Sequence, residues 1–253
     1  MAVSAAPTTL HSPTPRRPLL ARGARMLLAY LILLALLVVY QQKAPRFTER
    51  EWQSLANQGM TLTIASLGQT IVVLTGGIDL SVGPMVSLSN SIVATMGSQE
   101  SPDQRLALGI VVALLAGAAG GLINGLIIAY GRLQPIIVTL ATGYIYAGIA
   151  LHVRPRPGGY VPFDRADMVT GLVWGKVPAA LILLLILVAL WELFKRTRLS
   201  NRIISIGSSQ GAAYMSGVDV VRTKIWAYTL AGIASAVAGL FLTAQTASGD
   251  ANA

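Results

Sequence analysis

The stretch VVLTGGIDLSVGPM, residues Val72–Met85, interrupts a long apolar part of the chain with two glycines and a carboxylate. Asp79 stands between the mostly apolar residues 55–74 and the apolar run 85–96. A charge at that depth in a bilayer is costly unless a helix end or a water-filled cavity supports it. Irregular backbone is tolerated inside a membrane only where protein or such a cavity surrounds it. The stretch therefore predicts a membrane protein with a broken helix.

The composition agrees with a membrane protein. The chain has 253 residues, of which 54% are hydrophobic and 11% are charged, whereas soluble domains carry about 25% charged residues. No cysteine is present, which excludes a disulfide, a thiolate nucleophile and a cysteine metal site. The net charge of +9 comes from basic residues scattered between apolar segments, as in membrane proteins. We therefore expect a lipid bilayer, and no nucleic acid, as the partner of these charges.

Seven apolar segments approach the roughly 20 residues that a helix needs to cross a bilayer. They predict an all-α fold, a polytopic transmembrane helical bundle of about seven spans with a broken helix near residues 75–83. Residues 1–25, with four prolines, four arginines and no acid, predict a disordered basic cytoplasmic tail before a transmembrane domain at 26–253. The spans are expected at 26–40, 55–75, 82–97, 106–130, 134–151, 174–194 and 224–245.

The distribution of basic residues predicts the orientation. Cytoplasmic loops are enriched in Lys and Arg, and here such residues cluster in the N-terminal tail and again between the last two predicted spans. Six predicted crossings separate the two clusters, so both are expected on the cytoplasmic side. The loop 152–173, expected outside, departs from the rule because it also carries arginines. The second basic cluster comprises Lys195, Arg196, Arg198, Arg202, Arg222 and Lys224.

The polar residues within the apolar segments each have two interpretations. The Asp79 carboxylate, or the Ser81 hydroxyl, can accept the free N–H groups that open the next helix, or the break can lie beside a translocation pathway. Uncharged polar side chains can join helices through hydrogen bonds or line a path for a hydroxyl-rich solute. The sequence leaves both open for Asn57, Gln58, Gln69, Asn90, Asn124, Gln134 and Thr139.

Motifs for metal and nucleotide chemistry are absent from the sequence. It contains no His-x-x-x-His pair and no phosphate-binding loop, the patterns that mark those two kinds of chemistry. We therefore predict no enzyme, no cofactor and no metal site, and any use of ATP would belong to another subunit. The loop 195–218 predicts a short helix near 210–216, which either touches lipid headgroups or docks a cytoplasmic partner.

Three blocks of sequence resemble the permease subunits of bacterial ribose/xylose/galactoside-type ABC importers, which transport monosaccharides. The first is TGGIDLSVG, Thr75–Gly83. The second is GLINGLIIAYGRLQPIIVTLAT, Gly121–Thr142, and the third is RTRLSNRIISIGSSQGAAYMSGV, Arg196–Val218. They occur in the family's order, and the chain resembles the family from about residue 50 to its last residue.

The resemblance implies an inner-membrane permease that imports a monosaccharide or related polyol. It implies a second permease subunit as a homodimer partner, a cytoplasmic ATP-binding cassette ATPase and a periplasmic sugar-binding protein. It places Gly76, Gly77, Asp79 and Ser81 at the broken helix, and Asn90 and Asn124 are further candidates for the pathway. It places ATPase coupling on a segment at about 196–218, with the residues Gly207, Ala212, Ala213, Ser216 and Gly217.

Two features depart from the family pattern. Ser200 replaces a usual glycine, and Ser209-Gln210-Gly211 replaces residues like Asn-Pro-Glu. Members of the family continue through further spans and a second broken helix, so we expect a permease truncated at its C-terminus. The alternatives left open are a branched-chain amino-acid-type ABC permease, a secondary transporter without an ATPase, and a non-functional remnant.

Overall fold

The computed structural model describes residues 19–43, 48–97 and 101–252. They form two units that are described separately, one up to Thr48 and one from Glu49 onward. The first contains helix α1 (Leu19–Lys43). The predicted basic tail lies outside the described residues up to residue 18, and its last residues, 19–25, belong to α1. The described side chains of α1 are exposed and largely apolar, as in a helix that meets lipid.

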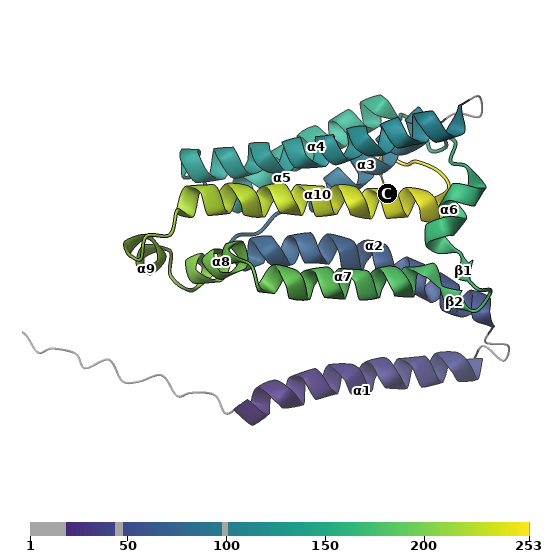
Figure 1. Cartoon of the computed structure of the whole chain (residues 1–253), viewed down its shortest axis with the longest axis horizontal. Coiled ribbons are helices and arrows are strands. Elements are labelled where there is room, and N and C mark those ends of the chain that lie inside the picture. The colour runs from purple at the N-terminus through teal and green to yellow at the C-terminus, as the bar shows by residue number, and fades with distance from the viewer. Residues whose placement is uncertain (1–18, 44–47, 98–100, 253) are drawn as a thin grey trace, which may run out of the picture. The chain divides into compact units, whose positions relative to one another are not determined.

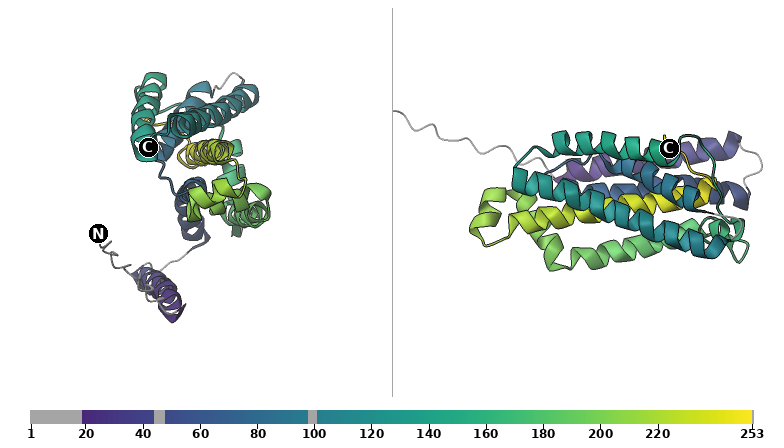
Figure 2. Two further views of the ribbon diagram at one scale, coloured as in Figure 1. Left: turned by 90° about the vertical axis from the view of Figure 1, so that its left-hand side faces the viewer. Right: turned by 90° about the horizontal axis from the view of Figure 1, so that it is seen from above.

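The second unit is a helical bundle built around its last helix. Figures 1 and 2 show α10 between the α4–α5 pair on one side and the α2–α7 pair on the other. Helices α8 and α9 lie at one end of this bundle, and α6 and the two short strands lie at the opposite end (Figure 1). The elements are α2 (Glu49–Val73), α3 (Val82–Met96), α4 (Pro102–Gly131), α5 (Pro135–Val153), α6 (Phe163–Thr170), β1 (Leu172–Val173), β2 (Val177–Pro178), α7 (Ala179–Lys195), α8 (Arg198–Ser208), α9 (Gln210–Met215) and α10 (Val220–Thr246).

Small residues allow α10 to pack closely against its neighbours. A Cβ placed on Gly232 would collide with the carbonyl of Gly117 on α4, and one on Gly121 would collide with the carbonyl of Tyr228. On the other side, a Cβ on Gly68 of α2 would come within 2.9 Å of the Ala234 side chain. Small residues permit this backbone approach between membrane helices. These contacts make α10 the central helix, with α4 packed on one side of it and α2 on the other.

The predominantly helical fold is confirmed, whereas the count of seven spans is not. Three of the described helices are long and apolar enough to cross a bilayer: α4 from Asp103, α5 and α10. Helix α3 has 15 residues, which rise only about 22 Å. The span expected at 174–194 begins at Ala179 instead, because Leu172 pairs with Pro178 and Val173 with Val177 in an antiparallel hairpin.

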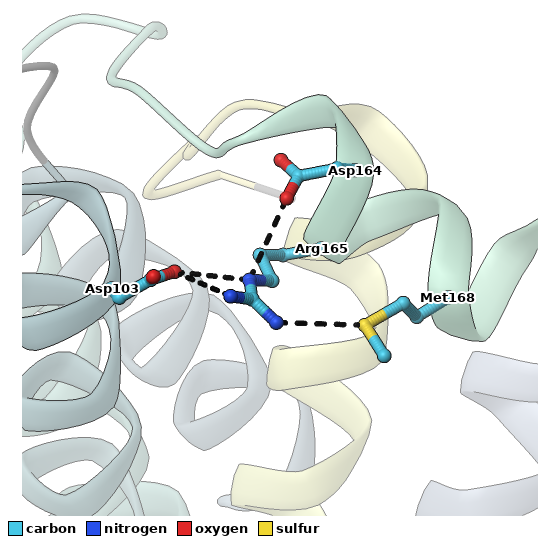
Figure 3. Close-up of polar contacts among 4 residues, drawn as sticks. All are labelled: Asp103, Asp164, Arg165 and Met168. Carbon is cyan, nitrogen blue, oxygen red and sulfur yellow. Dashed lines mark hydrogen bonds and ion pairs between the residues drawn. The ribbon is translucent and has the colours of Figure 1, made fainter.

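The α6 end of the bundle is tied together by polar contacts. Arg165 of α6 lies between two carboxylates, with its guanidinium 2.9 Å from Asp103 of α4 and 3.6 Å from Asp164 (Figure 3). Gly158 and Gly249 exchange backbone hydrogen bonds of 3.0 and 2.7 Å. These contacts join α4, α6 and the residues after α10 at the same end.

Candidate functional site: the break between α2 and α3

The break begins where α2 ends at Val73. The amides of Thr75 and Gly76 donate to the carbonyls of Val72 and Val73, both at 2.9 Å, so the chain closes a turn instead of continuing the helix. Gly76 has φ of +80°, a conformation that glycine adopts without the strain a Cβ would cause. The glycine pair predicted to shape the break therefore lies in it, with Gly76 at the point where the helical path is left.

The buried Asp79 carboxylate closes the break on the α3 side. One of its oxygens, Oδ1, accepts the Ser81 backbone N–H at 2.8 Å and the Ser81 hydroxyl at 2.6 Å. Asp79 is 5% exposed and Ser81 is 4% exposed. Ser81 occupies the N-cap position of α3, but its side chain makes no cap hydrogen bond. The carboxylate thus accepts the Ser81 backbone N–H just before α3, and the Ser81 hydroxyl donates to this carboxylate and not to the helix.

A third predicted residue completes this cluster from another helix. The amide nitrogen of Asn124, on α4, donates to the Ser81 hydroxyl oxygen at 2.9 Å. Asn124 is fully buried, and its Oδ1 accepts no hydrogen bond from the residues that the structure describes. Asn124, Ser81 and Asp79 therefore form one continuous hydrogen-bonded chain from α4 into the break.

Two more helices contact the break. Thr139 of α5 accepts the Leu80 backbone N–H at 3.0 Å and donates to the Pro135 carbonyl at 2.9 Å. From α10, the Tyr228 hydroxyl lies against the α-carbon of Gly77, where an added Cβ would collide with it. This hydroxyl is buried without a hydrogen-bond partner among the described residues. Thr139 is one of the polar residues that stand out in the sequence, whereas Tyr228 does not, because it lies far along the chain and carries no local motif.

Asn90 belongs to a different cluster. Its amide nitrogen donates to the Thr243 hydroxyl at 3.0 Å and to the Ser248 carbonyl at 3.1 Å, and its Oδ1 accepts the Asp250 N–H at 2.7 Å. These bonds hold the residues that follow α10 against α3. Of the residues predicted for the pathway, the structure brings the glycines, Asp79, Ser81 and Asn124 together and leaves Asn90 out.

The predicted coupling segment forms two short helices. Thr197 caps α8 by accepting the Ser200 N–H at 3.2 Å, and Ser209 caps α9 by accepting the Ala212 N–H at 3.3 Å. Helix α9 ends at Met215, where Gly217 has φ of +80° and donates to the Tyr214 carbonyl at 3.0 Å. Both termini of α9 thus have local hydrogen-bonding signals of the kind expected for helix caps.

The five residues predicted for coupling occupy different surroundings. Ala212 and Ser216 are exposed, whereas Ala213 is buried. Gly207 lies inside α8, one residue before its end, and not at the start of α9. A Cβ on Gly207 would collide with the carbonyl of Leu74, so α8 rests directly on the chain where α2 turns into the break. The coupling segment and the break are neighbours.

Comparison with known proteins identifies the family. A family model described as branched-chain amino acid transport system / permease component matches residues 52–253. Ribose import permease protein RbsC of Haemophilus influenzae is 32% identical over 231 residues, covering 88% of this chain and 69% of the relative. RbsC of Bacillus subtilis is 36% identical over 191 residues, covering 72% and 56%. D-allose transport system permease protein AlsC of Escherichia coli is 28% identical over 219 residues, covering 85% and 67%.

No solved structure matches the chain. The matched part spans 56–69% of the length of these three relatives. The family model covers most of the chain and includes all three sequence blocks, Thr75–Gly83, Gly121–Thr142 and Arg196–Val218. The chain therefore belongs to the permease family of the ribose-type ABC importers, as those blocks indicated.

Proposed function

We propose that this chain is a membrane-spanning permease subunit of an ATP-driven importer of a monosaccharide or related polyol. The observation that carries the proposal is the contact between the segment expected to meet an ATPase and the break expected at the pathway, through Gly207 and Leu74. A ligand or ATP can change the conformation of a transporter only if a structural element has two states and the ligand binds one of them better than the other. A helix break held by side chains from α4, α5 and α10, with α8 directly against it, is a suitable element.

The proposed partners follow from the two ends of the bundle. A cytoplasmic ATPase would dock at α9, where Tyr214 and Met215 are 71% and 84% exposed and offer an apolar surface for a protein contact. A periplasmic sugar-binding protein would meet the α6 end, and a second copy of the chain would complete the pathway. The protein would lie in the bacterial inner membrane with its N-terminus in the cytoplasm.

Copurification with the candidate ATPase tests the proposal. Ala212→Glu places a charge on an exposed position of α9, and Ala107→Glu makes the same change at an exposed position of α4 near the opposite end. We expect the ATPase to copurify with the wild type and with Ala107→Glu but not with Ala212→Glu. Uptake of ribose by the purified chain in vesicles without any ATPase would contradict the proposal and indicate a secondary transporter.

The matching family model is that of a branched-chain amino acid transport system permease component, which favours one second candidate, a branched-chain amino-acid permease. The two candidates differ in their solute: a sugar presents many hydroxyls, whereas leucine presents a charged ammonium, a carboxylate and an apolar side chain. Uptake of radiolabelled D-ribose and L-leucine, measured side by side with ATPase and binding protein supplied, separates them. Leucine uptake without ribose uptake would favour the second candidate.

A further inference from the structure

Helix α2 carries polar residues on two different sides. On one side, Gln53 and Asn57 both donate through their amide nitrogens to the carbonyl of Thr170, at 2.7 and 2.8 Å. These bonds fasten α2 to the end of α6, and the same side buries Ile64 and Ile71. The amides on this side therefore join helices, which is one of the two roles that the sequence left open.

The other side of α2 is exposed and also polar. Ser54, Gln58, Ser66 and Thr70 are exposed, with Leu62 completing a series in which each member follows the last by four residues. Residues four apart are neighbours on one face of a helix, so the series forms a slowly winding stripe. From Ser54 to Thr70 it extends about 24 Å along the helix, most of the thickness of a bilayer's hydrocarbon core.

The exposed sides of the other long helices differ from this stripe. Helix α4 exposes Leu115 and Leu122, α5 exposes Ile137 and Ile145, and α7 exposes Leu185. Those surfaces suit lipid tails. Polar side chains in membrane helices instead face protein or a water-filled cavity, because hydrocarbon offers no hydrogen-bond partner. The stripe on α2 is therefore poorly suited to face lipid.

The hydrogen bonds of the stripe determine what it can bind. The Ser66 hydroxyl donates to the Thr63 carbonyl at 2.9 Å, and the Thr70 hydroxyl donates to the Ser66 carbonyl at 2.7 Å. The hydroxyl protons are thus used within the helix, while the oxygen lone pairs remain available as acceptors. A surface of acceptors is complementary to a solute with many hydroxyl donors.

A groove lies along the stripe where it reaches the break. It has a volume of 420 Å³ and is lined by the polar residues Ser66, Gln69, Thr70 and Asp79 and the apolar residues Leu62, Ala65, Val73, Leu74 and Val82. Of its polar side chains, those of Ser66 and Thr70 are exposed, whereas the Gln69 side-chain oxygen is buried. A mainly apolar groove with a few polar groups is typical of small-molecule sites, and it matches a sugar, which has both C–H faces and hydroxyls.

We propose that the exposed polar face of α2, from Ser54 to Thr70, lines the aqueous path, and that the groove between Ser66 and Asp79 contacts the polyhydroxylated solute. This inference rests on the proposed function for the identity of the solute. The existence of a water-filled face at these positions is tested separately.

The absence of native cysteine allows a direct test. Ser66→Cys and Thr70→Cys are introduced singly, and Leu115→Cys and Leu185→Cys serve as controls, since these positions are 64% and 69% exposed but apolar. A water-soluble methanethiosulfonate reacts with the thiolate, which forms in water and not in hydrocarbon. In membrane vesicles we expect the stripe positions to react at least about tenfold faster than the controls. Equal, slow reaction at all four positions would overturn the proposal.

Two further measurements separate the possible occupants of the face. With D-ribose present, we expect modification of Ser66→Cys to slow, and L-leucine is expected to have no effect. Fast modification that neither solute slows would overturn the assignment of the groove to a sugar. Oxidative cross-linking of Ser66→Cys between two copies, without reaction with the water-soluble reagent, would assign the face to a subunit interface instead.

The outcomes also separate this inference from the proposed function. Fast modification together with a failure of ATPase copurification would contradict the importer and leave the aqueous face intact. ATP-dependent uptake without any modification of the stripe would support the importer and overturn the inference.

Discussion

At the scale of single residues, Asp79 holds the break through one carboxylate oxygen that accepts two hydrogen bonds from Ser81. Asp79→Ala leaves a buried N–H and a buried hydroxyl without that acceptor, which costs about 1–3 kcal/mol for each unsatisfied group. Asp79→Asn keeps a side-chain oxygen that can accept, so we expect a smaller loss. Thermal unfolding in detergent and folding yield measure both variants. An equal loss in the two would show that the charge itself is required.

Gly77 and Tyr228 offer a paired prediction. A Cβ on Gly77 would collide with the Tyr228 hydroxyl, which has no hydrogen bond of its own among the described residues. Gly77→Ala is therefore expected to destabilise by about 1–3 kcal/mol through overpacking, and Tyr228→Phe is expected to be nearly neutral. The double variant should recover much of the loss, because the colliding atom is gone. Chemical denaturation of all four proteins gives the coupling free energy, and strictly additive effects would contradict the contact.

Most of this cluster can be predicted from the sequence because its members stand out locally. A carboxylate in an apolar stretch and an asparagine in a long apolar helix are visible without a structure, and Asp79 and Asn124 lie in one hydrogen-bonded chain. Tyr228 has no such signal, since its role arises only when α10 packs beside Gly77. Asn90 has the same local signal as Asn124 but contacts the residues after α10, so residue type alone did not distinguish the two surroundings.

At the scale of elements, α8 and the end of α2 are joined by a backbone contact. Gly207 of α8 leaves no room for a Cβ beside the Leu74 carbonyl, whereas Gly211 of α9 has nothing within 4 Å of an added Cβ. Gly207→Ala should therefore destabilise by about 1–3 kcal/mol. Gly211→Ala should be neutral or slightly stabilising, because alanine is the better helix former by about 1 kcal/mol. The shift in thermal unfolding temperature of each variant checks this, and equal shifts would contradict the contact.

The helices themselves were predicted better than their ends. The apolar segments at 106–130 and 224–245 fall within α4 and α10, and the segment at 134–151 falls within α5 except for Gln134, since a long apolar run has few alternatives to a membrane helix. The segment at 174–194 is mostly apolar, yet its first residues form a hairpin, because Gly175 with φ of +71° permits a turn there. Hydrophobicity alone does not locate such a turn.

At the scale of the whole molecule, charge differs between the two ends of the bundle. The α8 end carries Lys195, Arg198, Arg202 and Lys224, of which Lys195 pairs with Glu192 and Lys224 donates to Gln210. At the α6 end, two arginines have polar partners from other elements. Arg165 pairs with Asp103 and Asp164 (Figure 3), and Arg154 donates to the Thr95 hydroxyl at 2.9 Å and to the Ala94 carbonyl at 3.3 Å. These contacts supply a structural role for two of the arginines that conflict with the positive-inside rule.

The difference between the ends predicts the orientation of the protein in the membrane. Basic side chains near span ends favour the cytoplasmic side, so the α8 end is expected inside the cell and the α6 end outside. Lys176→Cys lies in the hairpin between β1 and β2, and Met215→Cys lies at the end of α9; both native side chains are exposed. In cells with a permeabilised outer membrane, an impermeant maleimide should label Lys176→Cys at once and Met215→Cys only after the inner membrane is opened. The reverse pattern would invert the orientation and place α9 out of reach of any cytoplasmic ATPase, which would also contradict the proposed importer.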